Sequence, residues 1–376
     1  MAAVVCPLPN NSSAAIVSRP HPPPTPLPVE GLRLPLPPEI FLFALQSLSA
    51  PDLATCLRVN SGFAHLSLPL LYEHVRLSEH GAWPVYDDRA VPGPLTRERP
   101  YFLARGPLVQ RTRRVDLYPH STERCRRLPG GWGHTLPPLP KLQVLRIFLG
   151  TFWSGRRIYH TNVDPHDAAA RPGTLCAALY LVHAPTLVVR GLTFSHSTVP
   201  RHELSRTLED SVRHYIAVFE PDAPFILPRN GLAAARAAAT HFRQRLPAYL
   251  SHLTLVFHLP RGNWRHGAVT LSWALVHAFA SALWAQVVAW ACRGGGGGRL
   301  TIVNAGALAA GDGEEAPSAG ACAALQAAVR REFVAAISER MGDQAPRVLD
   351  NIEFLTMNEY LATAEAADVF DAGEVA

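Results

Sequence analysis

Three side chains near the middle of the chain have the chemistry of metal ligands. His160, Asp164 and His166 lie close together in the sequence, and imidazole nitrogens and carboxylate oxygens are ordinary zinc ligands. The segment has the composition of a loop, and no third histidine follows at a helical spacing. A cluster without a fixed scaffold does not hold a metal in one geometry. We therefore expect no metal site.

A second short motif has the chemistry of a cofactor-binding turn. Residues 304–306 read Asn-Ala-Gly after a predicted strand and resemble a turn of short-chain dehydrogenases. Those enzymes also need a tyrosine four residues before a lysine, and Pro137 stands at that distance before Lys141. The glycines at 294–298 lack the Gly-Lys-Ser/Thr that binds phosphate, and no Gly-x-Ser-x-Gly nucleophile motif is present. We expect no catalytic residue, no cofactor and no enzymatic activity.

The chain is basic overall, but it contains none of the sequence motifs that usually accompany nucleic-acid binding. The 376 residues carry a formal net charge of +5, and Lys141 is the single lysine among 35 basic residues. Arginines are concentrated in residues 76–130, whereas residues 307–376 are acidic. No zinc-finger spacing, aromatic ribonucleoprotein motif or basic zipper accompanies the arginines. Coding bias toward arginine explains the imbalance, and we expect no nucleic-acid partner.

Cysteine spacing and the N-terminal residues indicate the compartment. The six cysteines lie far apart, and no two of them form Cys-x-x-Cys, so neither a disulfide framework nor a cysteine zinc site has the required spacing. Pro7 and Pro9 interrupt the N-terminal apolar residues where a signal peptide would need a continuous stretch. These features predict an intracellular protein in the cytoplasm, the nucleus or both.

One apolar stretch is long enough to span a bilayer. Residues 271–292 contain no formal charge, and about 20 such residues suffice for a membrane helix. Many of them are alanines, which gain little from lipid, and Ser272, His277 and Gln286 are spread around the helix. We expect a helix buried between neighbouring elements and no membrane partner. A membrane-anchored interaction protein that uses residues 271–292 stays the alternative hypothesis.

The chain divides into four segments by composition. Residues 1–33 form a proline-rich tail, which excludes helix interiors and sheet ladders. Residues 34–77 predict a small helical unit, residues 78–108 form a Pro- and Gly-rich connector, and residues 109–376 alternate between strand-like and helix-like patterns. The expected fold class is therefore a small all-α unit followed by an α/β strand–helix array.

Capping residues divide the helical unit into three helices. Pro37 and Pro38 suit a helix start, and Glu39 in the first turn favours the helix dipole. Ser49 and Asn60 are N-cap residues for a second and a third helix. The first helix is apolar all round, and three short helices make a core too small to stand alone. We expect this unit to bury apolar surface against another protein.

The residues of this unit carry a family resemblance. Residues 34–77, LPLPPEIFLFALQSLSAPDLATCLRVNSGFAHLSLPLLYEHVRL, resemble an F-box in the form common among fungal F-box proteins. The markers that fall in register are Leu36-Pro37, Glu39-Ile40, Leu45, Leu48, Asp52-Leu53, Cys56, Val59-Asn60, Phe63, Leu66 and Pro69-Leu70-Leu71-Tyr72. The resemblance covers this segment alone and says nothing about a substrate.

The resemblance implies a docking partner. An F-box binds a Skp-type adaptor, which links it to a cullin in a ubiquitin ligase, so the chain would be a non-catalytic subunit that recruits a protein substrate for ubiquitin-dependent degradation. Three positions depart from the usual pattern. Ala44 stands where a larger residue is common, Gly62 where a basic residue is usual, and Phe63 where many members have tryptophan. The expected adaptor-binding residues are Leu36, Pro37, Glu39, Ile40, Leu45, Leu48, Leu53, Cys56, Val59 and Phe63.

Residues 109–376 show a recurring apolar pattern. Apolar residues at relative positions 1, 4 and 6 predict strands that end near residues 117, 147, 194, 255, 302 and 354, with helices over 174–182, 202–219, 232–250, 271–292 and 319–341. This pattern is that of leucine-rich repeats, in which strands line one face of a solenoid and helices the other. The intervals exceed the roughly 20–29 residues of a regular repeat. An irregular leucine-rich-repeat-like solenoid is expected, and another α/β layout stays open.

The sequence does not name the substrate-binding residues. In a solenoid, polar side chains on the strands would face a ligand, and Arg146, Arg190, Thr254 and Glu353 occupy such positions. Solvated strand residues have the same pattern, so the substrate and its site stay unknown at this stage.

Overall fold

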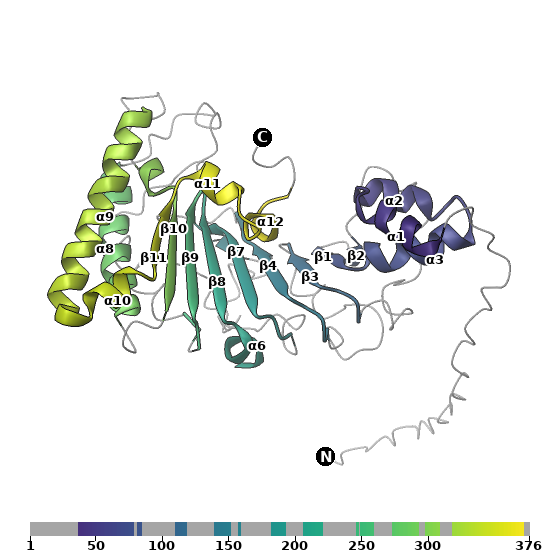
Figure 1. The fold of residues 1–376 in the computed structure, drawn as a ribbon, viewed down its shortest axis with the longest axis horizontal. Coiled ribbons are helices and arrows are strands. Elements are labelled where there is room, and N and C mark those ends of the chain that lie inside the picture. Colours follow the sequence, from purple (N-terminus) through teal and green to yellow (C-terminus); the bar gives the residue numbers. More distant parts are fainter. Residues whose placement is uncertain are drawn as a thin grey trace, which may run out of the picture.

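The computed structural model describes the sheet, the helices that pack on it and the N-terminal helices (Figure 1). The described residues are 37–78, 81–84, 110–118, 139–151, 157–158, 182–192, 206–220, 246–247, 249–258, 273–292, 298–308 and 318–371. The predicted tail at 1–33, residue Leu36, the metal-like segment at 160–166 and most of the connector lie outside these ranges.

A nine-stranded sheet forms the centre of the molecule, and eight of its strands are parallel. Its order is β11-β10-β9-β8-β7-β4-β3-β1-β2, with only the edge strand β2 antiparallel to its neighbour. The strands are β1 (His74–Ser78), β2 (Gly81–Pro84), β3 (Arg114–Leu117), β4 (Val144–Phe148), β7 (Thr186–Leu192), β8 (His214–Phe219), β9 (His252–Phe257), β10 (Arg299–Val303) and β11 (Ile352–Leu355).

The parallel strands follow one another in chain order from one end of the sheet to the other. Parallel neighbours need a crossover connection, because a tight hairpin joins only antiparallel strands. The chain therefore advances by one position with each crossover. The predicted α/β arrangement of strands and helices is confirmed. A separate pair, β5 (Gly150–Thr151) and β6 (Arg157–Ile158), forms a small antiparallel ribbon.

Three helices precede the sheet, as the capping residues predict. They are α1 (Pro38–Gln46), α2 (Ala50–Cys56) and α3 (Ser61–Leu71). The Ser49 hydroxyl accepts a hydrogen bond from the Asp52 amide, and the Asn60 side chain accepts from the amides of Gly62 and Phe63. Figure 1 shows these helices at the β1–β2 end of the sheet.

The helical unit is continuous with the sheet. Leu71 and Tyr72 at the end of α3 are buried in the same apolar cluster as Val75 of β1, and the buried Thr112 hydroxyl donates to the Tyr72 carbonyl. The predicted boundary at residue 77 therefore falls inside β1, because the apolar alternation of residues 74–77 serves the sheet. Strand β2 in turn lies within the predicted connector.

Long helices pack on one face of the sheet at its β9–β11 end. These are α8 (Trp273–Ala291) and α9 (Ala319–Met341), followed by the short α10 (Ala345–Leu349), and Figure 1 shows α8 and α9 beside the β9–β11 end. Trp284 of α8 packs edge-on against Phe257 of β9 and against Phe333 of α9. The uncharged stretch at 271–292 is thus largely a core helix, and no helix among the described residues is long and apolar enough to cross a membrane.

The prediction of a helix over 202–219 was wrong. A helix, α6, occupies only Arg206–Ser211, and His214–Phe219 form β8 in the middle of the sheet. After the half-buried His214, β8 is a short, buried and mainly apolar run, which periodicity does not distinguish from a buried helix. The longest predicted interval between strands, from 194 to 255, contains this missing strand. The other predicted helices at 174–182 and 232–250 lie mostly outside the described residues.

Candidate functional site

The first candidate site is an apolar surface on the N-terminal helices. Ile40 is 53% exposed, Phe43 77%, Leu48 38% and Val59 61%. We call these four residues the docking patch. Four exposed large apolar side chains on one small helical unit are available for contact with a partner. The patch can therefore bury apolar area against another protein.

The predicted adaptor-binding residues divide between surface and interior. Pro37 and Glu39 are exposed, and Ile40, Leu48 and Val59 belong to the docking patch. Leu45 and Leu53 are buried inside the unit, so they hold the helices together instead of facing a partner. Cys56 and Phe63 are half-buried, and the Phe63 ring meets the edge of Phe41 at 5.6 Å between centroids.

The structure adds Phe43 to this surface. Sequence reasoning placed Phe43 outside the list of contacts, because the family markers do not include it. The available signal was the helix that is apolar all round, since such a helix cannot turn every side inward.

The second candidate site is the sheet face opposite α8 and α9. Residues 357–371, which we call the C-terminal strap, lie over this face and include α11 (Met357–Leu361) and α12 (Ala366–Val369). Tyr360, Val369 and Phe370 of the strap are buried against valines and isoleucine of β4, β7, β8, β9 and β10. Figure 1 shows the two helices over the middle strands.

A buried pair of charges anchors the strap. Asp116 of β3 and Arg146 of β4 are register partners, and both side chains are fully buried. The Arg146 guanidinium donates from Nε to Asp116 Oδ1 at 2.6 Å and from Nη2 to the other carboxylate oxygen. Its Nη1 donates to the Val369 carbonyl at 3.1 Å, and Nη2 also donates to Asp371 Oδ1 at 3.1 Å. One guanidinium therefore joins the sheet to the strap.

Arg114 binds the same end of the strap. Its Nη2 donates to Asp371 Oδ1 at 2.6 Å, and its Nη1 donates to the Ala367 carbonyl at 2.9 Å. Nε of Arg114 also lies 3.3 Å from Asp116 Oδ1. Asp371 thus receives hydrogen bonds from two arginines, and charge-assisted bonds of this kind are about twice as strong as neutral ones.

Arg190 of β7 completes the arginine row. Its Nη1 donates to the Val369 carbonyl at 3.3 Å, and its Nη2 donates to Glu220 Oε1 at 3.1 Å. The guanidinium lies 5.1 Å from the Phe370 ring and 5.2 Å from the Phe148 ring. Contacts of a cation with an aromatic face at this distance are attractive.

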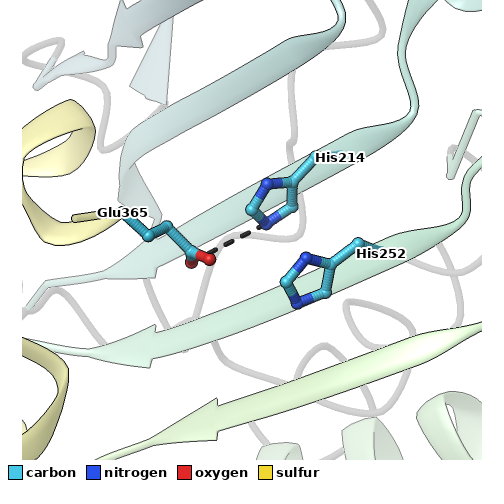
Figure 2. Close-up of side chains that lie close together, drawn as sticks. All are labelled: His214, His252 and Glu365. Atoms are coloured by element: carbon cyan, nitrogen blue, oxygen red, sulfur yellow. Dashed lines mark ion pairs between the residues drawn. The ribbon is translucent and has the colours of Figure 1, made fainter. Parts of the chain in front are cut away.

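A second polar row lies beneath the middle of the strap. His214 of β8 and His252 of β9 are register partners whose rings stack at 3.9 Å between centroids. Figure 2 shows the two rings side by side, with Glu365 reaching toward them from the strap. His214 Nε2 lies 2.9 Å from Thr254 Oγ1, and Glu365 Oε1 lies 3.7 Å from the same ring nitrogen.

Both imidazoles are neutral at physiological pH. Burial, together with the charges of His252 and Arg299, lowers the pKa of His214 from 6.5 to about 3. Burial and Arg299 lower the pKa of His252 to about 4, although Glu353 acts in the opposite direction. Burial raises the pKa of Glu365 despite hydrogen bonds from Thr254 and Tyr360. The two imidazoles therefore contribute to the row as neutral hydrogen-bonding groups.

The same three residues offer the ligand types of a metal site. One nitrogen from each histidine and one oxygen of Glu365 all lie within 4.8 Å of one another. Zinc needs bonds of about 2.0–2.2 Å directed along the ring lone pairs. The two imidazole planes are only 8° from parallel, so their lone pairs do not converge on a single point. The stacked arrangement fits the hydrogen bonds to threonine better than it fits a metal.

The row is also not arranged as a catalytic triad. Thr254 is fully buried, so its hydroxyl cannot reach a substrate. Glu365 faces the same ring nitrogen as the hydroxyl, whereas a triad carboxylate binds the opposite nitrogen. In the dehydrogenase-like turn, the Asn304 amide donates to the Phe257 carbonyl, and Gly306 packs closely against the backbone of Cys322 in α9. These groups hold the fold together.

Three of the four strand positions named from sequence, Arg146, Arg190 and Thr254, lie under the strap. Arg146 and Thr254 are fully buried and Arg190 is nearly so, because the strap covers them. In this structure they face neither solvent nor a separate ligand, and they share one face of the sheet. Glu353 of β11 lies beyond the strap and accepts a hydrogen bond from Arg299 at 2.8 Å. A scan of protein-family models, a search of curated proteins and a search of solved structures each found no match to this chain.

Proposed function

We propose that this chain is the substrate receptor of a Skp–cullin–F-box type ubiquitin ligase. Helices α1–α3 bind a Skp-type adaptor, and through it a cullin. The region from residue 109 onward binds a protein substrate, and the chain itself is a non-catalytic subunit. Its role is to hold the substrate close to a ubiquitin-loaded enzyme, so that transfer becomes effectively intramolecular.

The docking patch is the observation that carries this proposal. Ile40, Leu48 and Val59 belong to the ordered set of residues that resembles an F-box, and they are exposed on one small helical unit. Leu45 and Leu53 of the same set fill its interior. A unit that buries some of the family markers and exposes others is suited to dock on a partner, because its surface apolar residues are costly to leave in water.

The order of the strands supports the finer proposal of an irregular leucine-rich-repeat-like solenoid. In a solenoid each unit contacts only the units before and after it, so the strands appear in chain order. A doubly wound sheet instead reverses its order at a switch point. The eight parallel strands of this sheet follow chain order throughout the described residues. A solenoid offers one continuous sheet face for a protein ligand.

The adaptor assignment is tested by matched substitutions of exposed valines. Val59→Asp places a charge in the docking patch, whereas Val334→Asp places the same charge on the exposed side of α9, where Val334 is 42% exposed. Binding of the purified full chain to a Skp-type adaptor is measured by isothermal titration calorimetry. Val59→Asp should weaken binding at least about 30-fold, as expected for loss of about 2 kcal/mol at an interface centre.

The control should bind like the unchanged chain, because α9 lies on the sheet and not on the helical unit. Phe43→Ala is a second test of the docking patch, because it removes an exposed aromatic ring without adding a charge, and it should also lower the affinity for the adaptor. Circular dichroism establishes that each variant is folded. Equal affinities for all three variants and the unchanged chain would exclude the docking patch as the adaptor site.

A further inference from the structure

The strap is held in the way that proteins hold peptide ligands. The sheet contacts its backbone through the carbonyls of Ala367 and Val369, its side-chain carboxylate at Asp371, and the buried side chains of Val369 and Phe370. Backbone contacts give affinity in such complexes, and pockets for individual side chains give selectivity. Nothing in this set of contacts requires the bound segment to belong to the same chain.

The charges of the sheet face require an acidic ligand. Arg76, Arg114, Arg146 and Arg190 bring four positive charges to this face, and Asp116 and Glu220 supply two negative charges from the same sheet region. The strap adds two carboxylates: Asp371 binds Arg114 and Arg146, and Asp368 interacts electrostatically with Arg114. An unpaired charge in a buried position is strongly unfavourable. A segment that replaces the strap must therefore also present a carboxylate.

An exposed turn divides the strap into two parts, and residues 364–371 follow that turn. Ala362, Thr363 and Ala364 are exposed between α11 and α12, and α12 is a single four-residue turn with little stability of its own. Asp371 is 38% exposed. Burial also raises the pKa of Asp368, although the charge of Arg114 acts in the opposite direction. These features suit a segment that can leave the face without unfolding the sheet.

We propose that this sheet face is the substrate-binding surface, and that its ligand is a protein segment with an apolar residue, an aromatic residue and a carboxylate in succession. The strap residues Val369, Phe370 and Asp371 are an intramolecular example of that ligand, and substrate displaces them. This inference rests on the proposed function for its biological meaning. Because the strap belongs to the same chain, its effective concentration at the face is high, and only a ligand that binds more strongly displaces it.

The test uses the full chain with a specific protease site inserted between Thr363 and Ala364. After cleavage, a fluorescein-labelled peptide of residues 364–376 is added, and binding is followed by fluorescence anisotropy. The cleaved chain should bind the peptide saturably, and the uncleaved chain at least tenfold more weakly, because its tethered strap competes. Peptides with Asp371→Lys or Phe370→Ala should bind at least tenfold more weakly than the unchanged peptide.

Two arginine substitutions separate specific from general attraction. Arg114→Ala removes a direct partner of Asp371 and should weaken the peptide at least tenfold, whereas Arg331→Ala removes an exposed arginine of α9, on the other side of the sheet, and should not. The proposal is overturned if the cleaved fragment stays bound without exchange, if the sheet unfolds after cleavage, or if the Asp371→Lys peptide binds equally well. Since the assay contains no adaptor, its outcome is independent of adaptor binding.

Discussion

Acidification should destabilise this protein through the stacked histidines of β8 and β9. The pKa of His214 is lowered to about 3 and that of His252 to about 4, whereas both are near 6.5 in the unfolded chain. Between pH 6.5 and about 4 the unfolded chain therefore binds more protons than the folded chain. The free energy of unfolding then falls as the pH falls through this window, and above pH 6.5 the two histidines have no effect.

The expected size follows from the shift. A histidine that stays neutral in the folded state loses about 2 kcal/mol of stability between pH 7 and pH 5, at about 1.4 kcal/mol per pH unit below 6.5. His252 contributes less, because it is partly exposed and solvent screens its interactions. The raised pKa values of Glu365 and Asp368 have the opposite effect on stability. As the pH falls, these carboxyls are protonated in the folded chain before they are protonated in the unfolded chain, which stabilises the folded chain. Glu365 and Asp368 are unchanged in the histidine variant below, so their contribution cancels in the comparison, and the histidine pair alone should account for a loss of at least about 2 kcal/mol.

Urea unfolding at pH 7 and pH 5 measures this loss. The double variant His214→Gln, His252→Gln keeps polar groups near the threonine hydroxyls but cannot be protonated, so it should lose about 2 kcal/mol less than the unchanged chain over this range. His183→Gln is the matched control, because His183 is exposed and its removal should leave the pH dependence as it was. If the double variant loses as much stability as the unchanged chain, the histidine row does not set the acid sensitivity.

Three further predictions concern single residues. Arg146→Ala removes one partner of a buried ion pair and should lower the free energy of unfolding by about 3–5 kcal/mol in urea titrations; a loss below about 1 kcal/mol would contradict the burial of this pair. Gly306→Ala brings a methyl group within 2.3 Å of the Cys322 carbonyl oxygen and should cost about 1–3 kcal/mol. Gly320→Ala is the control, because its methyl group would meet only Ser318 Oγ at 3.9 Å, and it should not destabilise the chain. Lys141 is exposed, so self-ubiquitination in a reconstituted ligase should map by mass spectrometry to Lys141 or the α-amino group. Lys141→Arg should leave only the α-amino group, and modification at any other residue would refute this.

The sequence was informative wherever local patterns decide structure. Ser49 and Asn60 predicted two helix starts, because an N-cap side chain satisfies the first free amides of its own helix. The uncharged stretch from 271 and the pattern from 319 to 341 predicted α8 and α9. The apolar alternation that marked Arg146 and Arg190 also placed them correctly on one face of the sheet.

The features that sequence reasoning missed depend on distant contacts. Strand β8 was taken for a helix, and without it the pairing of His214 with His252 cannot be derived, because register partners are defined only between adjacent strands. The strap has an acidic, weakly apolar sequence that resembles a surface segment. Its buried contacts arise from arginines more than 170 positions earlier in the chain. No local pattern connects these residues.

The central claim is that the N-terminal helices bind a Skp-type adaptor. Size-exclusion chromatography with multi-angle light scattering, run on the purified full chain mixed with the purified adaptor, tests it most directly. The account predicts one peak with the mass of a one-to-one complex, and predicts that Val59→Asp restores two separate peaks. Two separate peaks for the unchanged chain, at concentrations of both proteins well above micromolar, would contradict the proposed function.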